Sequence, residues 1–212
     1  MKGFYAITYS VALALYGWLC FVASQAQYLP GDVGISEWFR GLDTPFVTDV
    51  MRVVTAAGDS ISVVLIILLI IIPLWFYGQR LEAIFVAVLP AVTGIITWLL
   101  KVLIGRPRPG AEFMDNGGLS FPSGHVSNTV ILFGLLFYII SRLINNPGLV
   151  KALRVVIVVH IALVAVSRVS LVEHWPSDVL GGIILGCLIL VPGIAVYNRF
   201  KGRKEDAGTA RS

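Results

Sequence analysis

The sequence predicts an all-α membrane protein, a bundle of six transmembrane helices with one or two interfacial amphipathic helices in the first outer loop. Hydrophobic residues make up 57% of the 212-residue chain and only 13% are charged, whereas soluble domains average about 25% charged residues. The mean hydropathy is +0.87. The charge-free stretches are also long enough to cross a bilayer, which takes about 20 apolar residues per helix. These observations exclude a soluble domain, a disordered chain and a disulfide scaffold.

Six apolar segments are predicted to span the membrane. Pro73, Pro90 and Pro192 fall inside them, which is tolerated because neighbouring helices satisfy the carbonyl groups that proline leaves free. The segments form a single membrane domain over residues 1–200, followed by a polar cytoplasmic tail at residues 201–212. The predicted spans cover residues 4–25, 60–79, 83–104, 123–141, 152–170 and 177–198.

The first span has an alternative interpretation as a cleaved secretory signal. Lys2 precedes the apolar stretch, and Ser24-Gln25-Ala26 resembles a small-residue cleavage site. The stretch is longer than the usual apolar core of a signal peptide, which has about 7–15 residues. We therefore expect this segment to remain as a transmembrane helix.

The distribution of basic residues predicts the orientation in the membrane. Six spans place both termini on one side, which carries ten of the sixteen Lys and Arg residues. The opposite side carries the other six, together with nine of the twelve acidic residues. Because loops rich in Lys and Arg stay in the cytoplasm, both termini are expected on the cytoplasmic side of the inner (plasma) membrane. The loops after the first, third and fifth spans then face the periplasm or exterior.

The first outer loop, residues 26–59, is where the amphipathic helix or helices are predicted. Ile35, Trp38, Phe39, Leu42 and Phe46 recur at roughly helical spacing with charged residues between them, as in helices that lie at a membrane surface. The favoured interpretation is a cover over the outer end of the bundle. The alternative is one wall of an entry route for a lipid.

Titratable residues gather at the outer ends of three spans, and such groups in membrane proteins are usually functional. Lys101 ends the third span, and Arg106 and Arg108 follow it, where Pro107 and Pro109 forbid the helix to continue. Three cations at a forced bend suit a bound anion.

The fourth span opens with Ser123, Gly124 and His125. Ser123 is a good N-cap residue, and Gly124 permits a ligand to approach the backbone closely. The N-terminus of a helix attracts anions, and His125 is placed to donate a proton there.

The third group lies between the fifth and sixth spans. Ser167 and Arg168 end the fifth span, and His174 and Asp178 flank Pro176 at the start of the sixth. A carboxylate four residues after a histidine can fix its tautomer and leave the other ring nitrogen free to attack. Cations, a helix N-terminus and two histidines together suit phosphoryl transfer. No carboxylate cluster is available for Mg²⁺, so we expect no metal or other cofactor and a phosphohistidine route.

These three motifs resemble the signature of the type 2 phosphatidic-acid phosphatase (lipid phosphate phosphatase) superfamily. The resemblance is to its bacterial membrane branch, which includes phosphatidylglycerophosphatase B and undecaprenyl-pyrophosphate phosphatases. Residues 1–100 agree with the family only in architecture. The matching residues are Lys101…Arg108-Pro109, Pro122-Ser123-Gly124-His125 and Ser167-Arg168…His174…Asp178.

The resemblance implies a role for each matching position. His174 is the expected nucleophile, Asp178 its orienting carboxylate, and His125 the general acid. Because one histidine must be neutral and the other protonated, a bell-shaped dependence of rate on pH is expected. Arg106 lies in the variable spacer and is less certain as a site residue. The residues expected to bind the substrate phosphate are Lys101, Arg108, Ser123, Gly124 and Arg168.

The resemblance also implies the substrate class. The expected partners are the bilayer and a lipid phosphate, with no nucleic acid. The resemblance does not choose between phosphatidic acid, phosphatidylglycerol phosphate and undecaprenyl pyrophosphate as the substrate. It does not give the oligomeric state. One alternative is a non-catalytic lipid transporter or scramblase, which would not need a nucleophile. Another is a vanadate-dependent haloperoxidase, an enzyme class that is soluble. His160, inside the fifth span, is expected to pack between helices, with support of Arg168 as the alternative.

Overall fold

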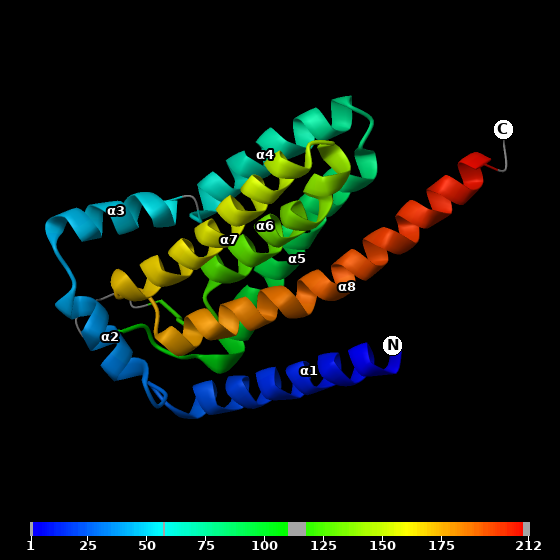
Figure 1. Ribbon diagram of the computed structural model, residues 1–212. Coiled ribbons are helices and arrows are strands. Elements are labelled where there is room, and N and C mark those ends of the chain that lie inside the picture. Colours follow the sequence, from blue (N-terminus) through cyan, green and yellow to red (C-terminus); the bar gives the residue numbers. More distant parts are fainter. Residues whose placement is uncertain (1, 57, 110–117, 210–212) are drawn as a thin grey trace.

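The computed structural model describes residues 2–56, 58–109 and 118–209, and the regular elements in that part of the chain are helices (Figure 1). This confirms the all-α fold class. The helices are α1 (Lys2–Gln25), α2 (Asp32–Gly41), α3 (Pro45–Ala56), α4 (Ser60–Phe76), α5 (Arg80–Ile104), α6 (Gly124–Leu143), α7 (Pro147–Ser170) and α8 (Pro176–Thr209).

Most of the predicted spans are long apolar helices. The helices α1, α5, α6, α7 and α8 are each long and apolar enough to cross a membrane. The further candidate is α4, which passes the same test only together with α3, and these two helices are bent by 47° relative to each other. The described chain is therefore a multi-pass membrane protein with five to six candidate spans, and the count of six stays a prediction.

Two helix ends differ from the predicted spans for local reasons. The second predicted span runs to residue 79, but α4 ends at Phe76 because Gly78 takes a left-handed conformation (φ 77°) that turns the chain. The fifth is predicted from residue 152, but α7 begins at Pro147. There the Asn146 side chain accepts a hydrogen bond of 3.1 Å from the Leu149 amide, and proline suits the first helical position.

The last helix, α8, continues past the predicted end of its span at residue 198 and reaches Thr209. A buried carboxylate on α5 fastens this extension to the bundle. Glu82 Oε1 accepts hydrogen bonds from the Tyr197 hydroxyl at 2.7 Å and from Lys201 Nζ at 2.5 Å. The first turn beyond the predicted span is thereby held against α5.

The central helix of the bundle is α6, which packs against α5, α7 and α8, while α4 covers α5 and α1 lies along α8 (Figure 1). At one end of the bundle, α2 and α3 lie across the region where α7 ends and α8 begins, and α2 contacts both. The two termini point toward the opposite end (Figure 1). Helices thus occupy the predicted amphipathic loop, and their position at the membrane interface stays a prediction.

Two glycines one helical turn apart let α8 approach α6 closely. A Cβ atom at Gly182 would lie 2.7 Å from the Ser123 carbonyl oxygen, and one at Gly186 would lie 2.7 Å from Val130 Cβ. Small residues four positions apart are a common device for packing transmembrane helices, where dispersion forces replace the hydrophobic effect. The spacing places the start of α8 directly against the start of α6.

We expect Gly186→Ala to lower the unfolding temperature of the detergent-solubilised protein. The added methyl group meets Val130 Cβ, which cannot move without its backbone, and overpacking of this kind costs about 1–3 kcal/mol. Gly17→Ala is the matched control, because a Cβ atom at that position in α1 meets nothing within 4 Å. Equal unfolding temperatures for the two variants would contradict the proposed close packing.

Candidate active site

Segments far apart in the sequence meet at the end of the bundle opposite the termini (Figure 1). Lys101 lies in the last turn of α5 and Arg168 in the last turn of α7, while Asp178 lies in the first turn of α8. A cavity of about 650 Å³ opens between these helix ends. The predicted site residues that line it are Lys101, Arg108, Gly124, His125 and His174.

The other predicted site residues stand beside this lining. The Ser123 amide donates a hydrogen bond of 3.0 Å to the Asp178 carbonyl oxygen. Ser123 occupies the N-cap position of α6, but its hydroxyl makes no capping bond. Arg168 and Arg108 both contact Glu173. The structure therefore gathers every residue that the three motifs predict for the site.

His174 is held in a tight turn between α7 and α8. The amide groups of Glu173 and His174 both donate to the Arg168 carbonyl oxygen, at 3.2 and 3.1 Å. The His174 side chain is 1% exposed, and its Nδ1 lies 3.5 Å from Asp178 Oδ2. That distance exceeds the 2.7–3.2 Å of an ordinary N–H···O bond. Asp178 therefore faces the ring at close range without a formed hydrogen bond.

Burial lowers the pKa of His174 to about 4, and the positive charges of Lys101 and Arg168 act in the same direction. Asp178 opposes these effects, since its carboxylate stabilises the imidazolium form. The burial effect is the largest, so the ring is neutral at pH 7. A neutral imidazole has one ring nitrogen with a free lone pair.

His125 in the first turn of α6 is paired with an acid that the motifs did not identify. Its Nε2 lies 2.8 Å from Asp59 Oδ1. Asp59 directly precedes α4, so the pair joins the start of one helix to the start of another. The only sequence signal for this partner is an acidic residue at the outer end of the second predicted span.

The cationic side chains differ in how far their hydrogen-bond donors are satisfied. Lys101 Nζ donates to the carbonyl oxygens of Leu119 and Ser120, at 2.7 and 2.9 Å. The Nε atoms of Arg108 and Arg168 and the Ser123 hydroxyl are buried and have no hydrogen-bond partner in the described structure. Buried donors are normally satisfied. A tetrahedral anion with several acceptor oxygens fits this set.

Arg106 is a structural residue that does not line the cavity. Its guanidinium is buried and donates to Asp32 Oδ2 at 2.7 Å and to Asp178 Oδ1 at 2.6 Å. It also donates to Ser177 Oγ and to the Gln27 carbonyl oxygen, at 2.7 and 3.1 Å. The doubt about Arg106 as a site residue is thus explained: it fixes the carboxylate behind His174 instead of lining the cavity.

His160 is apart from the site. Its ring centroid lies 4.5 Å from that of Phe133 on α6, and it does not line the cavity that contains the other two histidines. This placement agrees with packing between helices. Among the described residues, no three His, Cys, Asp or Glu side chains converge as a metal site would require.

The cavity continues as an apolar groove between α4 and α5. From the signature residues it runs along the two helices toward the middle of the bundle. The residues that line this part are Val63, Val64, Ile67, Leu68, Ile71, Ala87, Pro90, Ala91, Gly94, Thr97 and Trp98. Gly58 is the lining residue from the first outer loop, and no residue of α2 or α3 takes part.

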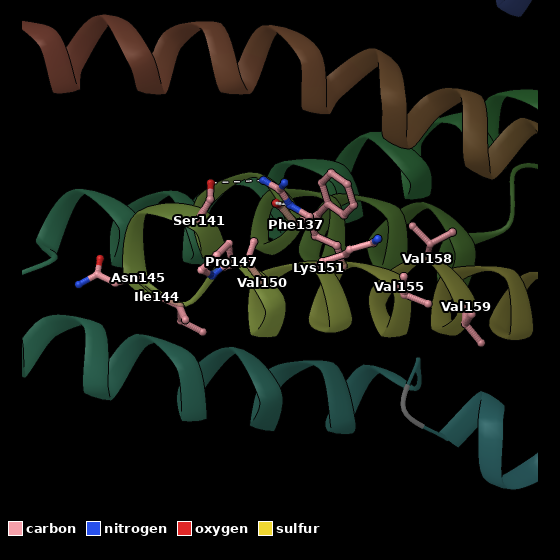
Figure 2. A pocket seen from close by; sticks show the side chains of 11 residues that line it. Phe137, Ser141, Ile144, Asn145, Pro147, Val150, Lys151, Val155, Val158 and Val159 are labelled. Carbon is pink, nitrogen blue, oxygen red and sulfur yellow. Dashed lines mark hydrogen bonds between the residues drawn. The ribbon is translucent and has the colours of Figure 1, made fainter.

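A second hollow of about 690 Å³ lies at the other end of the bundle, beside the turn between α6 and α7 (Figure 2). Figure 2 shows Phe137 and Ser141 on one wall and Lys151 with the valines of α7 on the other. It contains none of the signature residues. The candidate active site is therefore the cavity between α4, α5, α6 and the turn after α7.

Comparison with known proteins agrees with the signature. The model of the PAP2 superfamily matches residues 81–202 of the chain, which includes all three motifs. The chain belongs to the PAP2 superfamily. A PAP2 relative, phosphatidylglycerophosphatase B of Bacillus subtilis strain 168, is 30% identical over 162 residues, which cover 74% of this chain and 79% of the relative.

Other PAP2 proteins support the same assignment. A protein of Escherichia coli K12, provisionally named undecaprenyl-diphosphatase YbjG, is 35% identical over 144 residues, covering 62% of this chain and 67% of its own. The crystal structure of a transmembrane PAP2 type phosphatidylglycerolphosphate phosphatase from Bacillus subtilis shares the fold, with a TM-score of 0.77 and 24% identity over 89% of this chain and 96% of its own. The chain is therefore a membrane phosphatase of this superfamily.

We expect Arg106→Met to destabilise the protein strongly. Removing one partner of a buried ion pair leaves uncompensated charge on Asp32 and Asp178 and costs about 3–5 kcal/mol. For a chain of this size that corresponds to a fall of roughly 10 °C in the unfolding temperature in detergent.

Arg52→Met is the matched control. Arg52 pairs with Asp49 at 3.5 Å, but both side chains are mostly exposed, and such pairs contribute little to stability. If the two variants unfold at the same temperature, the structural role of Arg106 is wrong.

Proposed function

We propose that this PAP2 chain hydrolyses lipid phosphates through a phosphohistidine at His174, with its active site at the outer face of the membrane. Asp178 lies beside Nδ1, so Nε2 is the attacking atom. A bond forms from Nε2 to phosphorus while the bond from phosphorus to the lipid oxygen breaks. His125 gives its proton to that oxygen, then takes a proton from the water that cleaves the phosphorus–nitrogen bond and releases phosphate.

The phosphate is held by the cationic end of the cavity. Lys101, Arg108 and Arg168 surround its oxygens, together with the Ser123 hydroxyl and the Gly124 amide. The unsatisfied Nε atoms of the two arginines and the unsatisfied serine hydroxyl support this assignment. Charge-assisted hydrogen bonds from guanidinium groups suit phosphate oxygens and strengthen as charge builds up in the transition state.

The apolar groove carries the proposal that the substrate is a lipid. It runs between α4 and α5 directly from the cationic end of the cavity, so a phosphate bound there leaves its tail in contact with aliphatic side chains. Phosphatidic acid, phosphatidylglycerol phosphate and undecaprenyl pyrophosphate all have this form. The names of the Bacillus and Escherichia relatives favour the last two.

Charge and fold together support the outer-face location. The helix ends that carry Lys101, Arg168 and Asp178 lie at the end of the bundle away from the termini (Figure 1). The side of the termini carries ten of the sixteen Lys and Arg residues, and such sides remain cytoplasmic. The site then lies at the depth of the outer-leaflet headgroups in the inner (plasma) membrane, and a lipid reaches it without leaving the bilayer.

We expect His174→Ala to abolish turnover and phosphoenzyme formation, measured with a ³²P-labelled lipid phosphate in detergent micelles.

His125→Ala should lower turnover of the lipid by about 10²–10⁴-fold, the usual contribution of a general acid. The loss in the rate of phosphoenzyme formation should be much smaller for p-nitrophenyl phosphate, whose leaving group needs no proton. Because burial lowers the pKa of His174 to about 4, kcat/KM of the unmodified enzyme should fall on the acid side near pH 4, where protonation removes the nucleophile.

His160→Ala is the control, since this third histidine lies outside the cavity, and its turnover should match that of the unmodified enzyme. A His174→Ala enzyme with near-normal turnover would sink the mechanism. So would a phosphoenzyme that forms equally well in its absence.

We expect Ala91→Trp to discriminate between substrates by tail length. The indole fills the groove between α4 and α5, so KM should rise several-fold for long-chain phosphatidate and stay unchanged for a soluble short-chain analogue. Val92→Trp, at a neighbouring exposed position outside the groove lining, is the control. Equal effects on both substrates, or equal effects of both variants, would contradict the proposed path of the tail.

A further inference from the structure

One carboxylate already occupies the arginine pair of the active site. Glu173 Oε2 accepts a hydrogen bond of 3.2 Å from Arg108 Nη1 and a second, closer one from Arg168 Nη2. A single oxygen therefore bridges two of the three cations that are proposed to bind the phosphate. It takes the position that a phosphate oxygen bridging the two guanidinium groups would take.

The turn after α7 places this carboxylate there. The amides of Glu173 and His174 fold back onto the Arg168 carbonyl oxygen. Val172, which directly precedes Glu173 in this turn, takes a left-handed conformation (φ 57°) that is rare for a β-branched residue. The turn therefore directs two consecutive side chains into the site. His174 is buried, whereas the Glu173 side chain is 39% exposed.

Glu173 can leave without dismantling the site. Its carboxylate has contacts with the two arginines, and its exposure gives it water to move into. Arg168 keeps a second anchor, since Nη1 donates to Thr55 Oγ1 at 2.6 Å. The carboxylate is thus a removable partner of Arg168, which stays anchored through Thr55.

The surrounding membrane explains why such a partner is useful. Bulk phospholipids are phosphodiesters with one negative charge on the phosphate, whereas a phosphate monoester or diphosphate carries a larger charge near neutral pH. A bare cluster of three cations at headgroup depth would attract both kinds of lipid. A carboxylate in the cluster offsets one positive charge and must be displaced before any phosphate binds.

We propose that Glu173 is a displaceable competitor that makes the site selective for terminal phosphates over the phosphodiesters of bulk lipids. The proposal depends on the proposed function, because it takes Arg108 and Arg168 as phosphate ligands. Terminal phosphate, with its larger charge, displaces the carboxylate. A phosphodiester, with a single charge and a second ester group, does not.

Glu173→Gln tests this directly. The enzyme is assayed on a short-chain lipid phosphate in detergent micelles, with inorganic phosphate or phosphatidylglycerol added as competitor. Loss of one hydrogen-bonded charge should lower the inhibition constant of phosphatidylglycerol roughly tenfold, in line with hydrogen bonds to charged groups. The inhibition constant of inorganic phosphate should fall by a smaller factor, because its larger charge already displaces the carboxylate. An equal fall in both constants would contradict the selective role of Glu173. Phosphatidylglycerol should become a measurable competitor of the variant and remain a poor one for the unmodified enzyme. Glu173→Asp keeps the charge with a shorter reach and should fall between.

Glu37→Gln is the matched control, because Glu37 is an exposed acid of α2 without a contact to these arginines. Unfolding temperatures of all variants establish that they fold. If Glu173→Gln raises the inhibition constants, Glu173 positions the arginines and the proposal is wrong. If it leaves them unchanged, there is no competition and the proposal is also wrong.

Arg108→Gln and Arg168→Gln separate this proposal from the function on which it depends. If they weaken inhibition by inorganic phosphate while Glu173→Gln does not strengthen it, the phosphate site stands and the competitor role of Glu173 fails. If the arginine variants leave phosphate inhibition unchanged, the proposed phosphate site itself fails.

Discussion

The buried ion pairs of Arg106 are the interaction on which the site depends. This guanidinium joins Asp32 at the start of α2 to Asp178 at the start of α8. Ser177 extends the link, since its amide and hydroxyl both donate to Asp32. Three parts of the chain with no sequence proximity are therefore fixed together under the cavity. Asp178 is held in one orientation, and the imidazole of His174 lies against a carboxylate that cannot turn away.

The ends of several helices place the reactive side chains next to the ion pairs of Arg106. Lys101 and Arg168 close two helices at the same level at which His125 opens a third. The close approach of α8 to α6 at Gly182 fixes the position of Ser123 beside Asp178. Because backbone packing sets these positions, the helix ends bring Lys101, Arg168 and His125 together. That suits a reaction in which positioning and charge neutralisation supply most of the catalysis.

Much of the fold and of the site could be predicted from the sequence. Apolar runs define the helices, and polar residues at the ends of these runs are expected at the same depth in the membrane. Lys101, His125 and His174 were placed together on that basis. The partners Asp59, Asp32 and Glu173 were not, since their pairing depends on how the first outer loop and the turn after α7 fold over the bundle. Hydrophobic periodicity contains no information about such contacts. The end of α4 at Phe76 likewise depends on a single glycine conformation.

Burial decides the different behaviour of the acids around the cavity. Asp178 is fully buried and held by Arg106 and by the Trp175 amide at 2.8 Å, so this carboxylate is a fixed part of the site. Glu173 also pairs with arginine guanidinium groups, but its side chain is partly exposed. Water can therefore hydrate the carboxylate when it moves away from them. A buried charge cannot leave its partner without a large desolvation cost, whereas an exposed one can. The same residue chemistry therefore gives a fixed support behind His174 and an exchangeable ligand in front of the arginines.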